Sequence, residues 1–227
     1  MNKKQITHII IMSMVSCVTL FIVEQVIDFP YGLKTLCKIG LFLMIPVLYI
    51  RFVIKQPVRT FLNLRSFTWV RLKSGFFLGL LSIGIIYITY ILLNDFINER
   101  SIIYDLENRL GINAKEFIFI GIYITLGNSF LEEFYFRGFI FLRIYQMKHK
   151  LLAYVYSALL FSLYHIAIFA TWFNVWIMCI AVFGLFIVGL LFNWLNTRAK
   201  NFFNSWILHI CADVAVVTIG FYLYYIY

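Results

Sequence analysis

Six ionisable side chains lie deep inside long apolar stretches of this sequence. If such stretches lie in lipid, each charge at the bilayer centre costs about 2.5 to 3.5 kcal/mol even on a lenient scale, so these side chains need a function that offsets the cost. Carboxyl and imidazole groups are also the groups that take up and release protons in hydrolysis. The six residues are Glu132, Glu133, Arg137, His165, His209 and Asp213.

The spacing of the first three residues separates a paired acid from an unpaired one. Glu133 and Arg137 are four residues apart, so on a helix they share a face and can form an ion pair. Glu132 is rotated by about 100° from Glu133, on the same stripe as Asn128 and without a base on its own helix. A carboxyl group without a cation in a low dielectric takes up a proton readily, which suits a general base near neutrality.

The histidines are expected at the same depth as Glu132. His165 and Glu132 are equally far along the chain from a basic turn around His149, so in an antiparallel hairpin they lie at equal height. His209 and Asp213 are four residues apart on one face of the last apolar stretch. Three helices are therefore predicted to bring two acids and two imidazoles into one layer, nearer the inner side of the membrane.

Seven apolar stretches are long enough to supply these helices. A membrane-spanning helix needs about 20 mostly apolar residues. The predicted spans are residues 6–27, 35–54, 75–94, 117–142, 151–170, 173–195 and 205–226. The predicted fold is thus an all-α polytopic bundle forming one integral-membrane domain over 1–227, with scaffold spans in 1–116 and a core in 117–227.

Composition and charge agree with a membrane protein. Of the 227 residues 63% are hydrophobic and 13% are charged, which makes a soluble globule or a disordered chain improbable. The net charge is +9, and the excess of basic residues falls on every second connection between the predicted spans. By the positive-inside rule this pattern predicts a cytoplasmic N-terminus. The basic residues would then face anionic lipid of the inner leaflet, which argues against nucleic-acid binding. The inner segments hold Lys3, Lys4, Arg51, Lys55, Arg59, Arg65, Arg71, Lys73, Arg143, Lys148, Lys150, Arg198 and Lys200, and no acid. The outer segments hold Asp28, Asp95, Glu99, Asp105, Glu107 and Glu116, with Lys34, Lys38, Arg100, Arg109 and Lys115.

The chemistry-bearing residues form three short motifs that resemble a known family. Glu132-Glu133 with Arg137, Phe161 with His165, and His209 with Asp213 are similar to the motifs EExxxR, FxxxH and HxxxN/D, in that order. These motifs mark the CPBP family of CAAX proteases and bacteriocin-processing or self-immunity proteins, which includes the type II CAAX prenyl endopeptidases. The resemblance covers roughly residues 117–213.

The resemblance implies a role for each motif residue. Glu132 would activate a water molecule for attack on a peptide carbonyl, and His165 would help to hold or deprotonate that water. His209 and residue 213 would stabilise the oxyanion, while Glu133 and Arg137 would support the geometry. The characterised CAAX endopeptidases have Asn where this chain has Asp213. Asp213 would therefore be protonated, orient His209, or bind a metal.

A catalytic metal ion is an alternative that the sequence leaves open. Glu132, His165, His209 and Asp213 are all ligand types that Zn²⁺ accepts, although the HExxH spacing is absent. The family was first described as metalloproteases, whereas resemblance to its structurally described members implies a glutamate-based mechanism that needs no cofactor. We expect the metal-free mechanism.

The predicted function is that of an intramembrane endopeptidase. Its expected partners are membrane lipid and a small hydrophobic or membrane-tethered peptide, cut near the cytoplasmic leaflet. The many Ile, Phe, Lys and Asn residues suggest an AT-rich bacterial genome, so we expect a multi-pass protein of a bacterial cell membrane. Maturation of a peptide pheromone or bacteriocin, in quorum sensing for example, or self-immunity, then fits better than cleavage of a prenylated CAAX substrate.

Three other interpretations use the same residues. The polar groups could serve only to hold helices together, as interhelical hydrogen bonds do. The protein could be a non-enzymatic immunity or regulatory protein that binds a peptide or receptor in the same cavity. A proton-coupled transporter would also bury carboxylates, but paired broken helices or inverted repeats would be expected of it.

Overall fold

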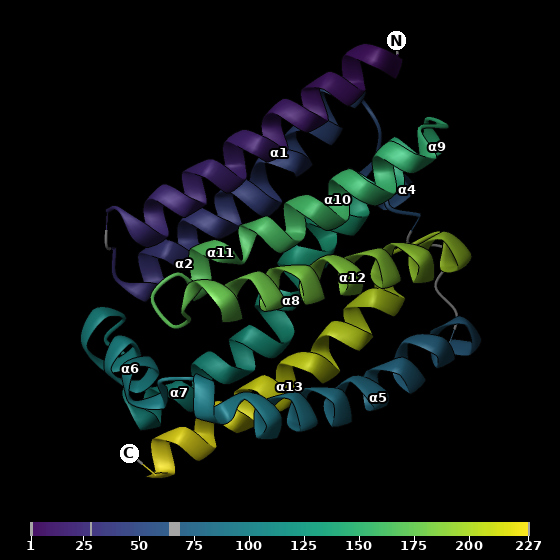
Figure 1. Ribbon diagram of the computed structural model, residues 1–227. Helices are drawn as coiled ribbons and strands as arrows, with labels where there is room; N and C mark the ends of the chain where they lie inside the picture. The colour runs from purple at the N-terminus through teal and green to yellow at the C-terminus, as the bar shows by residue number, and fades with distance from the viewer. Residues whose placement is uncertain (1, 28, 64–68, 227) are drawn as a thin grey trace.

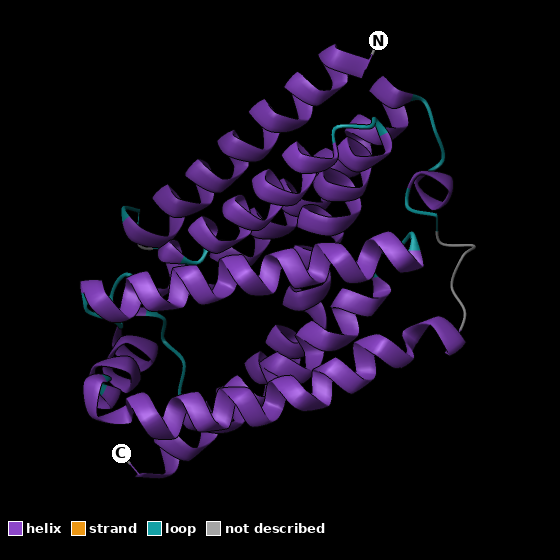
Figure 2. Cartoon of the chain, turned by 45° about the vertical axis from the view of Figure 1, so that its right-hand side comes forward, coloured by secondary structure: helices purple, strands orange, loops and turns teal. Residues whose placement is uncertain are grey.

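The chain folds as a bundle of helices. The computed structural model describes residues 2–27, 29–63 and 69–226, and this part is mostly helical and contains no strand (Figure 2). Within it, seven helical segments have the length and apolar character of a membrane span. They are Lys3–Gln25, Tyr31–Ile54, Leu72–Phe96, Ala114–Gln146, Lys150–Phe169, Val175–Ala199 and Phe203–Ile226. The prediction of an all-α membrane bundle is confirmed, and the span limits differ from the predicted ones by a few residues.

Three of the spans are single helices and four are built from two or more pieces. The single helices are α1 (Asn2–Gln25), α12 (Val175–Ala199) and α13 (Phe203–Ile226). Span three joins α5 (Trp69–Leu93) and η4 (Asn94–Phe96). Span two joins α2 (Tyr31–Ile39), η1 (Gly40–Met44), α3 (Ile45–Leu48) and η2 (Tyr49–Ile54). Span four joins α7 (Ala114–Ile122), η6 (Tyr123–Asn128), α8 (Ser129–Glu132), η7 (Glu133–Phe141) and α9 (Leu142–Gln146), and span five joins α10 (Lys150–Tyr164) and α11 (Ile166–Phe169). Short helices lie between spans: α4 (Val58–Phe61), α6 (Glu99–Tyr104) and η5 (Asp105–Arg109).

Span four forms the centre of the bundle. Every residue of its π-helical segment η7 is buried, although a span normally exposes one face to lipid. The rings around η7 pack closely: Phe42 of η1 stacks on Tyr135 with 4.0 Å between ring centroids. Ser157 of α10 donates a hydrogen bond of 2.9 Å to the carbonyl of Phe136, which satisfies a backbone group in the irregular helix. Neighbouring spans therefore hold the motif-bearing helix on several sides.

The remaining spans pack around this centre in pairs. Helices α5 and α13 lie side by side at one edge of the bundle, α12 lies beside α10, and α1 and α2 form the opposite edge (Figure 1). The contact between α5 and α13 is close because Gly75 and Gly79 face α13: a Cβ atom at Gly75 would lie 2.4 Å from the carbonyl oxygen of Asn204. This close contact positions α13, the helix that carries His209 and Asp213.

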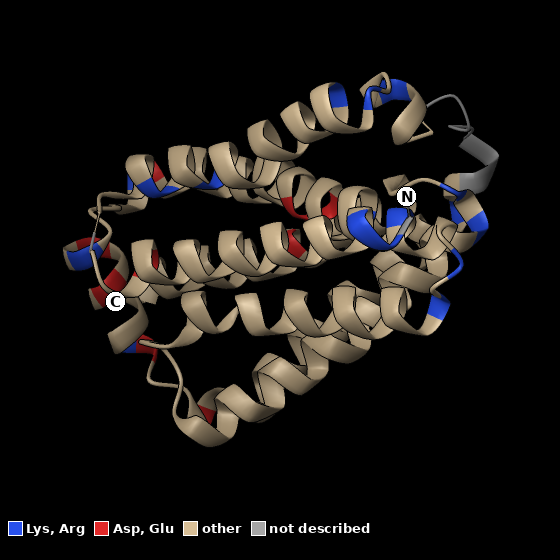
Figure 3. Cartoon of the chain, turned by 90° about the horizontal axis from the view of Figure 1, so that it is seen from above, with Lys and Arg blue, Asp and Glu red and all other residues tan. Residues whose placement is uncertain are grey.

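The charged residues divide between the two ends of the bundle. Figure 3 shows most Lys and Arg residues towards the end that carries the N-terminus, and most Asp and Glu residues at the end near the C-terminus, apart from the acids in the middle. This distribution agrees with a multi-pass membrane protein whose basic end faces the cytoplasm. Arg65 and Asp28, which belong to the predicted inner and outer sets, lie outside the described residues.

Candidate active site

Separate spans supply the residues of the candidate active site. Span four contributes Glu132 from the end of α8 and both Glu133 and Arg137 from η7. His165 lies at the break between α10 and α11, where its backbone N–H bonds the carbonyl of Ser162 rather than continuing the α-helix. His209 and Asp213 lie on α13, one turn apart. The structure thus brings together all six residues that the sequence singled out.

The carboxyl group of Glu132 is the centre of this cluster. Its side chain is only 1% exposed, and its Oε2 atom lies 3.7 Å from Nε2 of His165 and 3.9 Å from Nε2 of His209. Both distances are too long for a direct hydrogen bond. Among the described residues, Oε2 has no hydrogen-bond partner. One carboxylate oxygen and two ring nitrogens therefore face a common point, at a separation that suits a shared small molecule.

The Nδ1 atom of each imidazole ring makes a hydrogen bond that holds the ring in place. Nδ1 of His165 lies 2.7 Å from the carbonyl oxygen of Phe161, and Nδ1 of His209 lies 3.0 Å from Oε1 of Glu133. A carbonyl oxygen and a carboxylate can only accept, so Nδ1 is the donor in both rings. This bonding directs both Nε2 atoms towards Glu132 and sets which nitrogen of a neutral ring keeps its lone pair.

Glu133 and Arg137 form the ion pair that their spacing predicts. Nη1 of Arg137 lies 2.9 Å from Oε1 of Glu133, and both side chains are 0% exposed. The guanidinium group also lies 3.9 Å from the ring centroid of Phe161 and 4.7 Å from that of Phe192, so aromatic faces stabilise its charge. Because the same Oε1 atom accepts from His209, the pair orients the imidazole of span seven.

Lys38 is a site residue that the sequence analysis missed. The expectation that Glu132 has no cation nearby is wrong: Nζ of Lys38 lies 2.6 Å from Oε1 of Glu132. Asn128 donates to the same oxygen at 3.0 Å and accepts from Lys38. The sequence places Lys38 among the outer bases, yet in the structure it lies inside span two and its side chain is only 10% exposed. An ionisable residue inside an apolar stretch was the signal that could have identified it.

Asp213 approaches His209 without a direct hydrogen bond. Oδ1 of Asp213 lies 3.7 Å from Nε2 of His209, on the side of the ring that faces Glu132. Its Oδ2 atom is buried and makes no hydrogen bond to the described residues. Asp213 is therefore near enough to act on a group bound at His209, and it has hydrogen-bonding capacity to spare.

The donor set does not fit a metal centre in this arrangement. Within the part of the chain that the structure describes, no group of three or more His, Cys, Asp or Glu side chains is arranged to hold a metal ion. The ammonium group of Lys38 is bonded to Glu132, so a divalent cation at that carboxylate would be held close to a positive charge.

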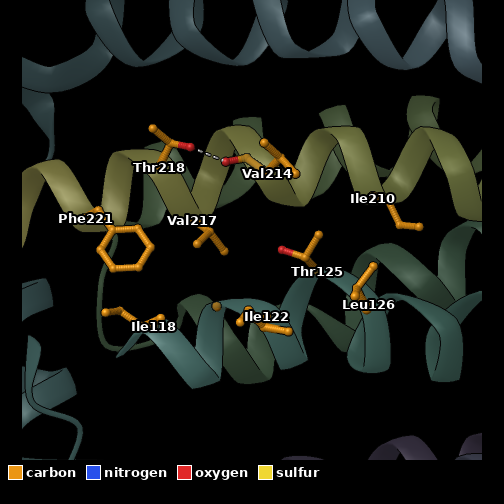
Figure 4. A pocket seen from close by; sticks show the side chains of 10 residues that line it. Ile118, Ile122, Thr125, Leu126, Ile210, Val214, Val217, Thr218 and Phe221 are labelled. Carbon is orange, nitrogen blue, oxygen red and sulfur yellow. Dashed lines mark hydrogen bonds between the residues drawn. The ribbon is translucent and has the colours of Figure 1, made fainter. Parts of the chain in front are cut away.

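A groove runs along the surface beside the site. Its volume is about 410 Å³, and it lies between α13 on one side and α7 with η6 on the other, with the side chains of both walls facing each other (Figure 4). The lining is almost entirely apolar: Ile118, Gly121, Ile122, Thr125, Leu126, Ile210, Val214, Val217, Thr218 and Phe221. Ile210 and Val214 directly follow His209 and Asp213 in the sequence, so one end of the groove lies near the site.

Comparison with known protein families gives a match that covers the site. Residues 114–215 match the family model described as type II CAAX prenyl endopeptidase Rce1-like. The chain has no match among curated proteins or solved structures. The matched segment is a little under half of the chain and contains the three motifs from Glu132 to Asp213, whereas Lys38 lies outside it.

Proposed function

The chain carries an Rce1-like type II CAAX prenyl endopeptidase segment in residues 114–215, and from this premise we propose that it is an intramembrane endopeptidase. The Rce1-like family is a protease family, and the match to it supports a peptidase activity for this chain. The observation that carries the proposal is the approach of two Nε2 atoms to the unbonded Oε2 atom of Glu132, at 3.7 and 3.9 Å, in a buried site.

In the proposed reaction a water molecule binds between Glu132 and His165. It donates one proton to Oε2 of Glu132 and the other to Nε2 of His165, which leaves an oxygen lone pair free to attack the peptide carbonyl. As the new C–O bond forms, Glu132 takes the first proton. As the C–N bond breaks, Glu132 passes this proton to the leaving amine, and the second proton of the water stays on the new carboxyl group. One water is therefore consumed, and an amine and a carboxylic acid, which then ionises in water, are released.

We propose that the oxyanion of this reaction is stabilised from α13. His209 lies beside three carboxyl groups, those of Glu132, Glu133 and Asp213. As an imidazolium, it would donate from Nε2 to the oxyanion while Nδ1 stays bonded to Glu133. Preorganised donors of this kind typically contribute a large part of the rate enhancement in amide hydrolysis. No metal ion takes part in this mechanism.

The proposed substrate is a small hydrophobic or membrane-tethered peptide. The apolar groove between α13 and span four supports this choice, since Ile122, Leu126 and Val214 in its walls are exposed where the protein meets lipid. A role in maturing a bacterial peptide pheromone or bacteriocin, or in self-immunity, is the form of this function that we propose.

The proposal is tested by substituting Glu132. We expect Glu132→Gln to lower kcat by about 10²- to 10⁴-fold, because the amide cannot accept the proton of the attacking water. The assay would incubate purified protein in nanodiscs with hydrophobic peptides and detect cleavage by mass spectrometry. Glu107→Gln, at an exposed position of η5, is the matched control and should keep full activity.

Two results would contradict this assignment. Unchanged turnover in Glu132→Gln would remove Glu132 as the general base. A cellular phenotype that survives Glu132→Gln but is lost when the groove is altered would favour a non-enzymatic binding protein. Elemental analysis of the active protein tests the metal-free mechanism, and a stoichiometric metal would overturn it.

A further inference from the structure

We propose that Lys38 is a positioning residue of the active site, which binds one oxygen of Glu132 and so presents the other to the reacting water. The proposal rests on the proposed function of Glu132. It assigns a role in the reaction to span two, which lies outside the segment that matches the protease family.

The hydrogen bonds around Glu132 are unequally divided between its two oxygens. Oε1 accepts from Nζ of Lys38 at 2.6 Å and from Nδ2 of Asn128 at 3.0 Å. Oε2 accepts from no described residue and is the oxygen that faces both imidazoles. Lys38 and Asn128 therefore hold the carboxylate in one rotational state, with the proton-accepting oxygen directed at the site.

The ammonium group is itself held from several sides. Lys38 donates to Asn128 as well as to Glu132, and Nζ lies 5.0 Å from the ring centroid of Tyr164 and 5.7 Å from that of Phe42. Tyr164 immediately precedes His165 in the chain. The cation therefore joins span two to both spans that would position the water, and the charge of Glu132 is balanced in a buried site.

A second ion pair on the same helix, made by another buried lysine, provides a matched control. Lys34, one turn before Lys38 on α2, lies 3.3 Å from Oε2 of Glu24, and its side chain is only 2% exposed. This pair ties α2 to α1 but includes none of the residues that surround Glu132. If Lys38 has only a structural role, removal of either lysine should have the same kind of effect.

The experiment compares kcat, KM and thermal stability in purified Lys38→Met, Lys38→Arg and Lys34→Met. We expect Lys38→Met to lower kcat at least tenfold with KM within threefold of the parent value, because the apolar groove is formed by other helices. Lys38→Arg, which keeps the charge, should recover a large part of kcat. Lys34→Met should lower the melting temperature but keep kcat within twofold.

The proposal is overturned if Lys38→Met keeps kcat within twofold, or if Lys34→Met loses as much kcat as Lys38→Met. If Lys38→Met does not fold, Lys38→Gln takes its place, because it keeps a hydrogen-bond donor without the charge. A loss of kcat of at least tenfold in Lys38→Gln would then support the proposal, and a kcat within twofold of the parent value would overturn it. Full activity of Glu132→Gln would refute the proposed function instead. An inactive Glu132→Gln with a fully active Lys38→Met would refute only the role of Lys38.

Discussion

At the scale of single residues, the site depends on how each polar group is held. Glu132 makes its hydrogen bonds through Oε1, and each histidine is held through Nδ1, so one atom of each residue remains to meet the substrate. The large majority of buried polar atoms in proteins have at least one hydrogen-bond partner. Groups that keep one atom unbonded at a common point are instead typical of a site that binds and converts a ligand.

Asp213 is the residue whose role a substitution can resolve most directly. If residue 213 assists the oxyanion as a donor, Asp213→Asn should keep kcat within threefold or raise it, because an amide N–H donates without a negative charge. Asp213→Leu should lower kcat by about 10²-fold or more. Steady-state kinetics on a cleavable peptide would measure both. An equal loss in the two variants would show that the carboxylate itself is needed, for instance to orient His209.

At the scale of the helices, the irregular backbone of span four determines where its site residues point. The π-helical segment η7 begins at Glu133, directly after the proposed general base. Short π-helical turns occur often at functional sites, where they change the direction in which side chains point. Here η7 carries the Glu133–Arg137 pair, while Glu132 ends the preceding α8 and points to the histidines.

The contact of α5 with α13 should be sensitive to a single methyl group. Gly75→Ala would place Cβ 2.4 Å from the carbonyl oxygen of Asn204, so the helices must separate. Overpacking of this kind typically costs about 1 to 3 kcal/mol. Gly84→Ala, on the same helix with no atom within 4 Å of the added Cβ, should be neutral or stabilising. Thermal unfolding in detergent would compare the two, and equal melting temperatures would contradict the close contact.

At the scale of the whole molecule, the charge distribution predicts how the bundle is oriented in the membrane. Basic residues gather towards the end that carries the N-terminus, as the positive-inside rule requires of a cytoplasmic side (Figure 3). Acidic residues gather at the other end, where Asp105 forms an ion pair of 2.6 Å with Arg109. By this rule we predict that the hairpin turn after Gln146 lies in the cytoplasm and the η5 helix outside.

Cysteine labelling in intact cells would test this orientation. Lys148→Cys lies at an exposed position of the turn between spans four and five, and Asn108→Cys lies at an exposed position of η5. We expect a membrane-impermeant maleimide to label Asn108→Cys above the wild-type background and to label Lys148→Cys only after the cells are opened. The reverse pattern would invert the orientation and place the proposed cleavage on the other leaflet.

Much of the fold and part of the site follow from local features of the chain. Apolar stretches of sufficient length predict the seven spans, because a helix is the simplest way to satisfy the backbone in lipid. The ion pair between Glu133 and Arg137 follows from their spacing on one helix. The common depth of Glu132 and His165 follows from equal distances along an antiparallel hairpin, and their carboxylate and imidazole groups lie 3.7 Å apart.

Other features were decided only by the tertiary structure. Contact between Lys38 and Glu132 depends on the rotation and tilt of span two against span four, which the rise and period of a single helix do not determine. The same holds for the rings of His165 and His209, whose directions are set by Phe161 and Glu133. The amino-acid sequence alone therefore determined which groups lie at the depth of the site, and the packing of the helices decided which of their atoms face one another.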